Sequence, residues 1–247
     1  MTEVTLLAYT GATTDFYNTG DRVGWEGTSH SDPELLLEFA GRACYQSWDK
    51  PNPKTAETVD YIGHMLDVNH LSVVEHATAS FYLEDVSRSF THELVRHRHL
   101  SFSQLSQRYV DLAENTVMPV MPPLCRKDSV AESIVYDAFA TAVESYIRLE
   151  THLRETHPEL GTKQVREAAR ALLPNCTPTS IVVSGNFRSW LEFIDKRDNQ
   201  HADREIAEVA GVIRALLKQV APAVFGPVVN TGVTQLGNTH NPTKDTT

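Results

Sequence analysis

The amino-acid sequence predicts an α+β fold, with a central mixed or antiparallel sheet that is flanked by helices. Some segments alternate apolar and polar residues, and others repeat apolar residues at the three- and four-residue spacing of helices. The two kinds of segment follow one another without the regular alternation that builds a parallel sheet. The length of 247 residues and the even composition favour a single domain, residues 1–247.

The first half of the chain begins with a predicted strand from Thr5 to Tyr9. Ser31-Asp32-Pro33 is a helix-start signal, and apolar residues follow it at helical spacing: Leu35, Leu36, Phe39, Ala40 and Ala43. A second helix is predicted over residues 56–69, with one apolar face: Val59, Ile62, Met65 and Leu66. Residues 77–83 alternate and predict a strand with one buried side: Ala77, Ala79, Phe81 and Leu83.

The next predicted helix carries basic residues at its C-terminal end, where cations suit the helix dipole. Phe90, Leu94 and Val95 anchor it to a core. The proline-rich stretch Met118–Pro123 predicts a loop. The later predicted elements are helices over about 128–156 and 161–173 (stopped before Pro174), a buried strand over 180–184, helices over about 186–199 and 201–220, and a disordered tail at about 237–247.

The composition excludes several classes of function. The chain has 32 acidic and 22 basic side chains, a formal charge of −10, which argues against a general nucleic-acid surface. No apolar run approaches the ~18 residues of a membrane span, and the start lacks the pattern of a signal peptide. Three cysteines without a Cys-x-x-Cys pair favour reduced thiols, so we expect a cytoplasmic protein.

Basic residues are nevertheless concentrated in one run, Arg96–Tyr109. Arginine grips phosphate or carboxylate oxygens in pairs, and the neighbouring hydroxyl and amide side chains supply neutral hydrogen bonds for a heterocycle. This combination predicts a nucleotide site, whereas the alternative is a solvated helix end with surface ion pairs. The neutral polar residues are Ser101, Ser103, Gln104, Ser106 and Gln107.

A second group of polar residues lies further along the chain. Arg166 and Arg170 are four residues apart on one predicted helix, and Asn186-Phe187-Arg188 opens the next. If that helix continues unbroken, one face of it carries four residues: Asn186, Phe193, Arg197 and His201. Its apolar stripe is Phe187, Trp190, Leu191 and Ile194. The alternatives are a surface pair between Arg188 and Glu192 and a structural histidine.

The pattern Arg-His-Arg at 96–98, seven residues and then Ser106-x-Arg108 resembles the signature of the flavin-dependent thymidylate synthases. The likeness covers roughly residues 35–225 and is greatest to the actinobacterial members. Five other segments are also similar to the family, in its order: Gly41–Tyr45, His70–His76, Ala169–Pro174, Asn186–Arg188 and Arg197–His201.

The resemblance implies the thymidylate synthase-complementing fold and reductive methylation of dUMP to dTMP. The carbon comes from 5,10-methylenetetrahydrofolate, and NADPH supplies electrons through FAD. A homotetramer with shared active sites is expected. Arg197 is the expected catalytic residue, because a guanidinium beside the uracil amide edge stabilises negative charge there.

The resemblance also assigns the binding residues, with no metal. The FAD residues are Ser72, Arg96, His97, Arg98, Gln104, Asn186, Phe187, Arg188 and His201. The dUMP residues are Glu93, Leu94, Val95, Arg96, Gln104, Leu105, Ser106, Gln107, Arg108, Arg170 and Arg197. Candidates for folate contacts are His70 and Tyr109.

Four residues need separate interpretation. The family motif often carries Asn and Glu where this chain has Ser103 and Gln104, so we expect neutral hydrogen bonding from Gln104. Glu192 stands where relatives carry Asn or His and is left out of the site. Ser106 is expected to donate to the nucleotide phosphate, because a serine nucleophile needs an adjacent base. Cys176 is expected to be an ordinary thiol.

Two other functions fit part of the pattern. His92, Glu93, His97 and His99 have the chemistry of metal ligands, which suggests a metal hydrolase, although the nearby arginines repel a divalent cation. A nucleotide-sensing module explains the arginines of the first run but not the second group around Arg197.

Overall fold

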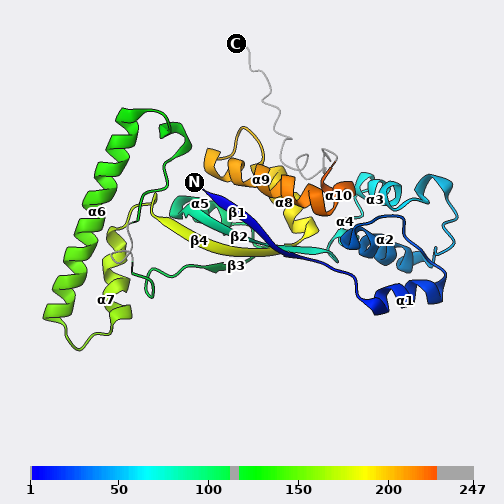
Figure 1. The fold of residues 1–247 in the computed structure, drawn as a ribbon, viewed down its shortest axis with the longest axis horizontal. Coiled ribbons are helices and arrows are strands. Elements are labelled where there is room, and N and C mark those ends of the chain that lie inside the picture. Colours follow the sequence, from blue (N-terminus) through cyan, green and yellow to red (C-terminus); the bar gives the residue numbers. More distant parts are fainter. Residues whose placement is uncertain (1, 112–116, 227–247) are drawn as a thin grey trace, which may run out of the picture. The chain divides into compact units, whose positions relative to one another are not determined.

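The computed structural model describes residues 2–111 and 117–226, and its strands form one open antiparallel sheet (Figure 1). The order across this sheet is β1 (Glu3–Tyr9), β2 (Thr78–Ser87), β4 (Pro178–Asn186) and β3 (Ser101–Gln104). β3 pairs antiparallel with β4, with Ser101 opposite Ser184 and Gln104 opposite Ile181. The predicted α+β class is therefore confirmed. The strands predicted at 5–9, 77–83 and 180–184 are present, with longer bounds.

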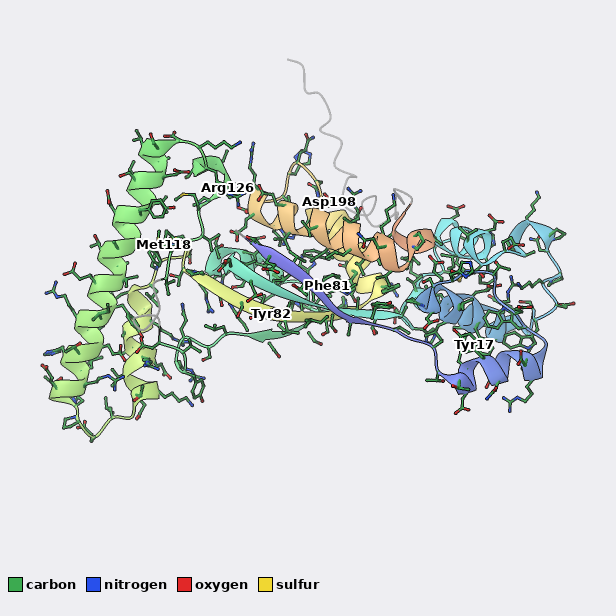
Figure 2. All side chains as sticks on the ribbon, viewed as in Figure 1. Tyr17, Phe81, Tyr82, Met118, Arg126 and Asp198 are labelled. Carbon is green, nitrogen blue, oxygen red and sulfur yellow. The ribbon has the colours of Figure 1, made fainter. Side chains whose placement is uncertain are left out.

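β2 shows how the alternation of the sequence becomes a sheet face. Ala79, Phe81 and Leu83 are buried as predicted, and Ala77, directly before the strand, is buried too. Figure 2 labels the neighbours Phe81 and Tyr82, which project from opposite faces because successive strand residues do so. Sequence analysis did not predict β3, because Ser101–Gln104 is short and mostly polar.

The helices begin where the sequence provides caps. Ser31 and Asp128 accept hydrogen bonds from the first-turn amides of α2 and α6, as N-cap residues do. α6 and α7 lie side by side (Figure 1). The helices are α1 (Thr14–Val23), α2 (Asp32–Tyr45), α3 (Thr58–Asp67), α4 (Leu71–Val74), α5 (Arg88–Leu94), α6 (Ser129–Thr156), α7 (Thr162–Ala169), α8 (Phe187–Arg197), α9 (Arg204–Val220) and α10 (Pro222–Phe225). Short 3₁₀ turns lie at Pro53–Thr55, Pro123–Cys125 and Arg170–Leu172.

Some predicted helix faces were wrong in detail. On α3, Ile62, Met65 and Leu66 are buried, but Val59 is 57% exposed. On α2, Leu36 and Phe39 are only half-buried, whereas Leu37 is fully buried beside a charged pair, Glu38 and Arg42. A stripe of apolar residues cannot reveal that pair. Val95, predicted to anchor α5, is 44% exposed because the helix ends at Leu94.

The helix predicted over 186–199 ends at Arg197, so His201 does not share its face. The chain turns instead, because the Asn199 side chain accepts a hydrogen bond from the His201 amide at 2.9 Å. Asp203 accepts from the Glu205 amide at 3.0 Å and starts α9. Phe193, predicted on the same face as Arg197, is fully buried in the core. The helix predicted over 161–173 is α7 followed by a 3₁₀ turn, and it stops before Pro174 as predicted.

The chain divides into two compact units, each built from separate stretches of sequence. Unit 1 comprises residues up to Leu7, Ser80–Ser184 and Arg197–Val209, and unit 2 comprises Ala8–Ala79, Gly185–Lys196 and residues from Ala210 onward. In unit 2, the indole Nε1 of Trp190 donates to the Ala79 carbonyl at 3.1 Å.

Several smaller predictions meet the structure here. Cys44, Cys125 and Cys176 are free thiols, and burial raises the pKa of Cys176. Met118–Pro123 is a loop up to the 3₁₀ turn at Pro123, and the predicted tail at 237–247 lies outside the described residues. Throughout residues 2–111 and 117–226, no helix is both long and apolar enough to cross a bilayer.

Candidate functional site

Helix α5 carries several candidate residues and is fixed at its N-terminus by a buried carboxylate. The Ser87 hydroxyl accepts from the Phe90 amide at 2.9 Å and donates to Glu205 Oε2 at 2.6 Å. Glu205 Oε1 accepts from the Ser87 amide at 2.8 Å. Burial raises the pKa of Glu205 above its ordinary value, although the hydrogen bonds from Ser87 oppose this. These bonds set the start of α5, and therefore the positions of Arg88 and Glu93.

Arg197, the expected catalytic residue, lies at the end of α8 against the end of α5. Its Nη1 donates to Glu93 Oε2 at 2.8 Å, and its Nη2 donates to the Glu93 carbonyl at 3.3 Å. Its Nε donates to His97 Nε2 at 3.0 Å. Only 18% of the Arg197 side chain is exposed. Segments about 100 residues apart in sequence thus meet.

Two further arginines lie near one another without an acidic partner. Burial, and then the nearby positive charge of Arg170, lower the pKa of Arg88 below its ordinary value. Both side chains are half-buried, and neither makes an ion pair or side-chain hydrogen bond within the described residues. Two partly desolvated like charges are unfavourable unless an anion binds between or beside them.

Arg166, one turn before Arg170, shows the opposite behaviour. Its Nε donates to Glu150 at 3.2 Å, Nη1 donates to the Tyr109 carbonyl at 3.0 Å, and Nη2 pairs with Asp111. These partners raise the pKa of Arg166, against the effect of burial. Arg166 is therefore a structural residue, and Arg170 has the chemistry of a ligand-binding one.

Arg88 is the residue that sequence analysis missed. It lies outside the Arg-His-Arg run and outside every segment that carried the resemblance. The only signal in the sequence is its spacing: Arg88 comes first in the helix whose last turn holds Glu93. Its importance depends on the position of Arg170, which is distant in sequence.

The turn after α5 presents the two arginines of the Arg-His-Arg motif to solvent. The Arg96 and Arg98 side chains are exposed, and within the described residues they form no ion pair or hydrogen bond. Cations in this state remain available for an anionic ligand. The backbone follows as a turn from His97 to Leu100, whose amide donates to the His97 carbonyl at 3.1 Å.

The polar residues on and after β3 adjoin α5. Gln104 Nε2 donates to Thr91 Oγ1 at 3.1 Å, which fits the predicted neutral role. Gln107 is only 7% exposed, yet its side chain has no hydrogen-bond partner among the described residues. The donors and the acceptor of this amide are therefore available to a ligand. Arg108 pairs with Glu167 at 3.1 Å on the surface.

Ser106 has no partner that could activate it as a nucleophile. Its Oγ accepts from the Arg108 amide at 3.4 Å and contacts no histidine or carboxylate in the described part of the chain. The Leu105 amide donates to the Ser180 carbonyl at 2.9 Å, so only its carbonyl faces other partners. Leu94 is fully buried, which leaves only its main chain for a nucleotide.

Four of the predicted flavin residues belong to unit 2. Ser72 is exposed on α4, and Arg188 pairs with Glu75 at 2.5 Å on the surface. The Asn186 side chain accepts from the Ser189 amide at 2.8 Å and caps α8. The Phe187 ring is buried against Phe225, so only its main chain can reach a ligand.

The remaining candidate residues are His201, Glu192 and the metal-ligand types. His201 is exposed in the loop between α8 and α9. Glu192 makes an ion pair with Lys196 rather than with Arg188, and Arg188 pairs with Glu75. No three His, Cys, Asp or Glu side chains of the described ranges gather as a metal site.

Comparison with known proteins shows the family of the chain. The family model described as "Thymidylate synthase complementing protein" matches residues 28–223. The chain is 51% identical over 219 residues to the "Flavin-dependent thymidylate synthase" of Mycobacterium avium (strain 104), covering 87% of this chain and 86% of that protein. The protein of the same name from Mycobacterium bovis (strain BCG / Pasteur 1173P2) is 49% identical over 219 residues, with the same coverage. On the match to most of its length, this chain belongs to the thymidylate synthase complementing protein family.

Proposed function

We propose that this protein is a flavin-dependent thymidylate synthase that methylates dUMP to dTMP. 5,10-Methylenetetrahydrofolate donates the carbon, and NADPH is the reductant. Family membership and the names of its relatives support the flavin and the reaction. The single observation that carries the site is the set of unit 1 arginines whose side chains have no protein partner within the described residues, Arg88, Arg96, Arg98 and Arg170, in the unit where Glu93 and His97 hold Arg197.

The nucleotide phosphate is proposed to bind at Arg88 and Arg170. A phosphate relieves the repulsion between the two guanidinium groups and accepts paired hydrogen bonds from each. Ser106 and Arg108, one turn from β3, supply further donors. The side-chain amide of Gln107 gains a partner in the same nucleotide. Arg88 thereby joins the dUMP residues predicted from the sequence.

The flavin fits the donor chemistry of the Arg-His-Arg turn. Arg96 and Arg98 are exposed and unpaired among described residues, as the diphosphate of FAD requires. When bound, FAD carries electrons from the reductant toward the carbon transferred to the pyrimidine. We propose that Ser72, Asn186, Phe187, Arg188 and His201 are its other contacts, with Phe187 acting through its main chain.

Arg197 is proposed to activate the pyrimidine. Its guanidinium binds the uracil amide edge and stabilises negative charge there, which makes the ring carbon nucleophilic. No side chain needs to attack the ring covalently, and Ser106 lacks a base for that role.

The two units are proposed to work as one catalytic domain, and the protein as a cytoplasmic homotetramer with shared active sites. The chain passes repeatedly from one unit to the other, which favours a joint role. Val130 and Ile134, four residues apart on α6, are 68% and 64% exposed, as expected for residues that another subunit covers.

The test is an assay for thymidylate from labelled deoxyuridylate, with FAD, the folate donor and NADPH each omitted in turn. We expect product only with all three present. Purified protein should be yellow and bleach with NADPH when air is excluded. A colourless protein that contains zinc would indicate a hydrolase, and a colourless, metal-free nucleotide binder would indicate a sensor.

A further inference from the structure

Each nitrogen atom of the Arg197 guanidinium donates one hydrogen bond. The Nε–H and one N–H on each Nη atom are used, by His97 Nε2, Glu93 Oε2 and the Glu93 carbonyl. An arginine has five N–H donors. Within the described residues, one N–H therefore remains on Nη1 and one on Nη2.

The same contacts define the state of His97. Arg197 has only donors, so His97 Nε2 must accept, which requires a ring without a proton on that nitrogen. Glu93 lies at the end of α5, and His97 lies in the turn that follows it. Arg197 comes from α8. Within residues 2–111 and 117–226, the hydrogen-bond partners of the Arg197 side chain thus all come from the short stretch between Glu93 and His97.

We propose that Glu93 is a positioning residue for the reaction, which orients the guanidinium of Arg197 through its carboxylate and carbonyl oxygens. His97, accepting through Nε2, supports the same orientation. This inference rests on the proposed function, and it differs from the role that the resemblance gives Glu93, which is contact with the nucleotide. Arginine is long and flexible, and a displacement of about 1 Å in a reacting group costs roughly 100-fold in rate.

The two roles predict different kinetics. A residue that only binds the nucleotide raises the KM for dUMP and leaves kcat unchanged. A residue that orients Arg197 lowers kcat, and its effect disappears when Arg197 is absent. A double-mutant cycle between Glu93 and Arg197 measures this dependence.

The experiment compares Glu93→Gln, Arg197→Ala and the double variant, as holoenzymes with measured flavin content. For each, kcat, the KM for dUMP and the release of the hydrogen at uracil C5 are recorded. We expect Glu93→Gln to retain flavin and lose roughly 10- to 100-fold in kcat and in C5 hydrogen release. In the Arg197→Ala background, the same change should alter the residual rate by less than about twofold.

Glu208→Gln is the matched control, because Glu208 pairs with Arg126 at 2.7 Å in the same unit and, within the described residues, makes no ion pair with Arg197. It should stay within about twofold of the wild type. Equal losses from Glu93→Gln with and without Arg197, or a rise in KM alone, overturn the inference. If the wild type itself makes no thymidylate, the proposed function fails, and direct dUMP binding by the same variants still reports their coupling.

Discussion

Arg42 in unit 2 differs from Arg88 and Arg170 in unit 1 in whether the protein supplies hydrogen-bond partners for the guanidinium group. In unit 2, Arg42 is 2% exposed, and its Nε donates to Glu38 at 2.6 Å. Its Nη atoms donate to the Thr55 carbonyl at 2.6 Å and the Ser47 carbonyl at 3.3 Å. In unit 1, Arg88 and Arg170 are half-buried near each other and have no such partners within the described residues.

The difference separates structural arginines from ligand-binding ones. A buried guanidinium is tolerated when protein oxygens satisfy its donors, as Arg42 and Arg166 show. One that is partly desolvated beside a like charge, as Arg88 is, is the kind for which we propose an anionic ligand. The number of arginines in a segment is therefore less informative than whether the fold supplies their partners.

The largest stability effect is expected in unit 2. Glu38→Gln removes the carboxylate from a pair that is almost wholly buried, which leaves the Arg42 charge uncompensated. The free energy of unfolding should fall by about 3–5 kcal/mol, measured by urea denaturation. Glu208→Gln, which breaks an exposed pair, should cost less than about 1 kcal/mol. Similar losses for both variants would contradict the expected difference between a buried and an exposed ion pair.

The largest effect on catalysis is expected at Arg197. Arg197→Ala removes the group that stabilises charge on the pyrimidine, so thymidylate formation should fall about 100- to 1000-fold. Flavin should stay bound, as its absorbance will report. Unchanged turnover would remove Arg197 from its assigned role.

A smaller effect, on the affinity for dUMP, is expected at Arg88. It tests whether an arginine without protein partners binds the ligand. Arg88→Met removes one phosphate ligand, worth about 1.5–3 kcal/mol for a charged hydrogen bond, so dUMP should bind roughly 10- to 100-fold more weakly. The free protein should lose no stability, because repulsion from Arg170 is relieved. Calorimetric titration with dUMP and thermal unfolding measure the two quantities.

Arg166→Met is the matched control for Arg88→Met. Because Arg166 is satisfied by Glu150 and Asp111, its loss should lower stability. If Arg166→Met and Arg88→Met change stability and dUMP affinity alike, the partners of an arginine do not decide its role.

The smallest expected effect is a pH dependence of the free energy of unfolding, which comes from Glu205. Its folded pKa is raised by burial, so its contribution to stability is fully present below the ordinary value of 4.5 and is lost as pH rises through the folded pKa. The unfolding free energy of the wild type should therefore fall relative to that of Glu205→Gln as the pH rises above 4.5. A difference that stays constant across this range argues that Glu205 does not titrate.

Elements with strong local patterns were predicted best. β2 follows from the alternation of apolar and polar residues, α6 from a capping aspartate, and α3 from helical spacing. All three signals act within a few residues. β3 was missed because pairing with β4 stabilises it, not its own composition. The break after Arg197 was missed because short polar hydrogen bonds at Asn199 and Asp203 compete with the helix.

By itself, the sequence determined the α+β class, the basic run from Arg96 and the family-like order of its motifs, because these depend on residue type and spacing. Only the tertiary structure decided which arginines are satisfied. It brought Arg197 to Glu93 and His97, Arg88 to Arg170, and Arg166 to Glu150. The charge state and availability of a side chain depend on burial and on neighbours from distant segments, and spacing along the chain does not encode those.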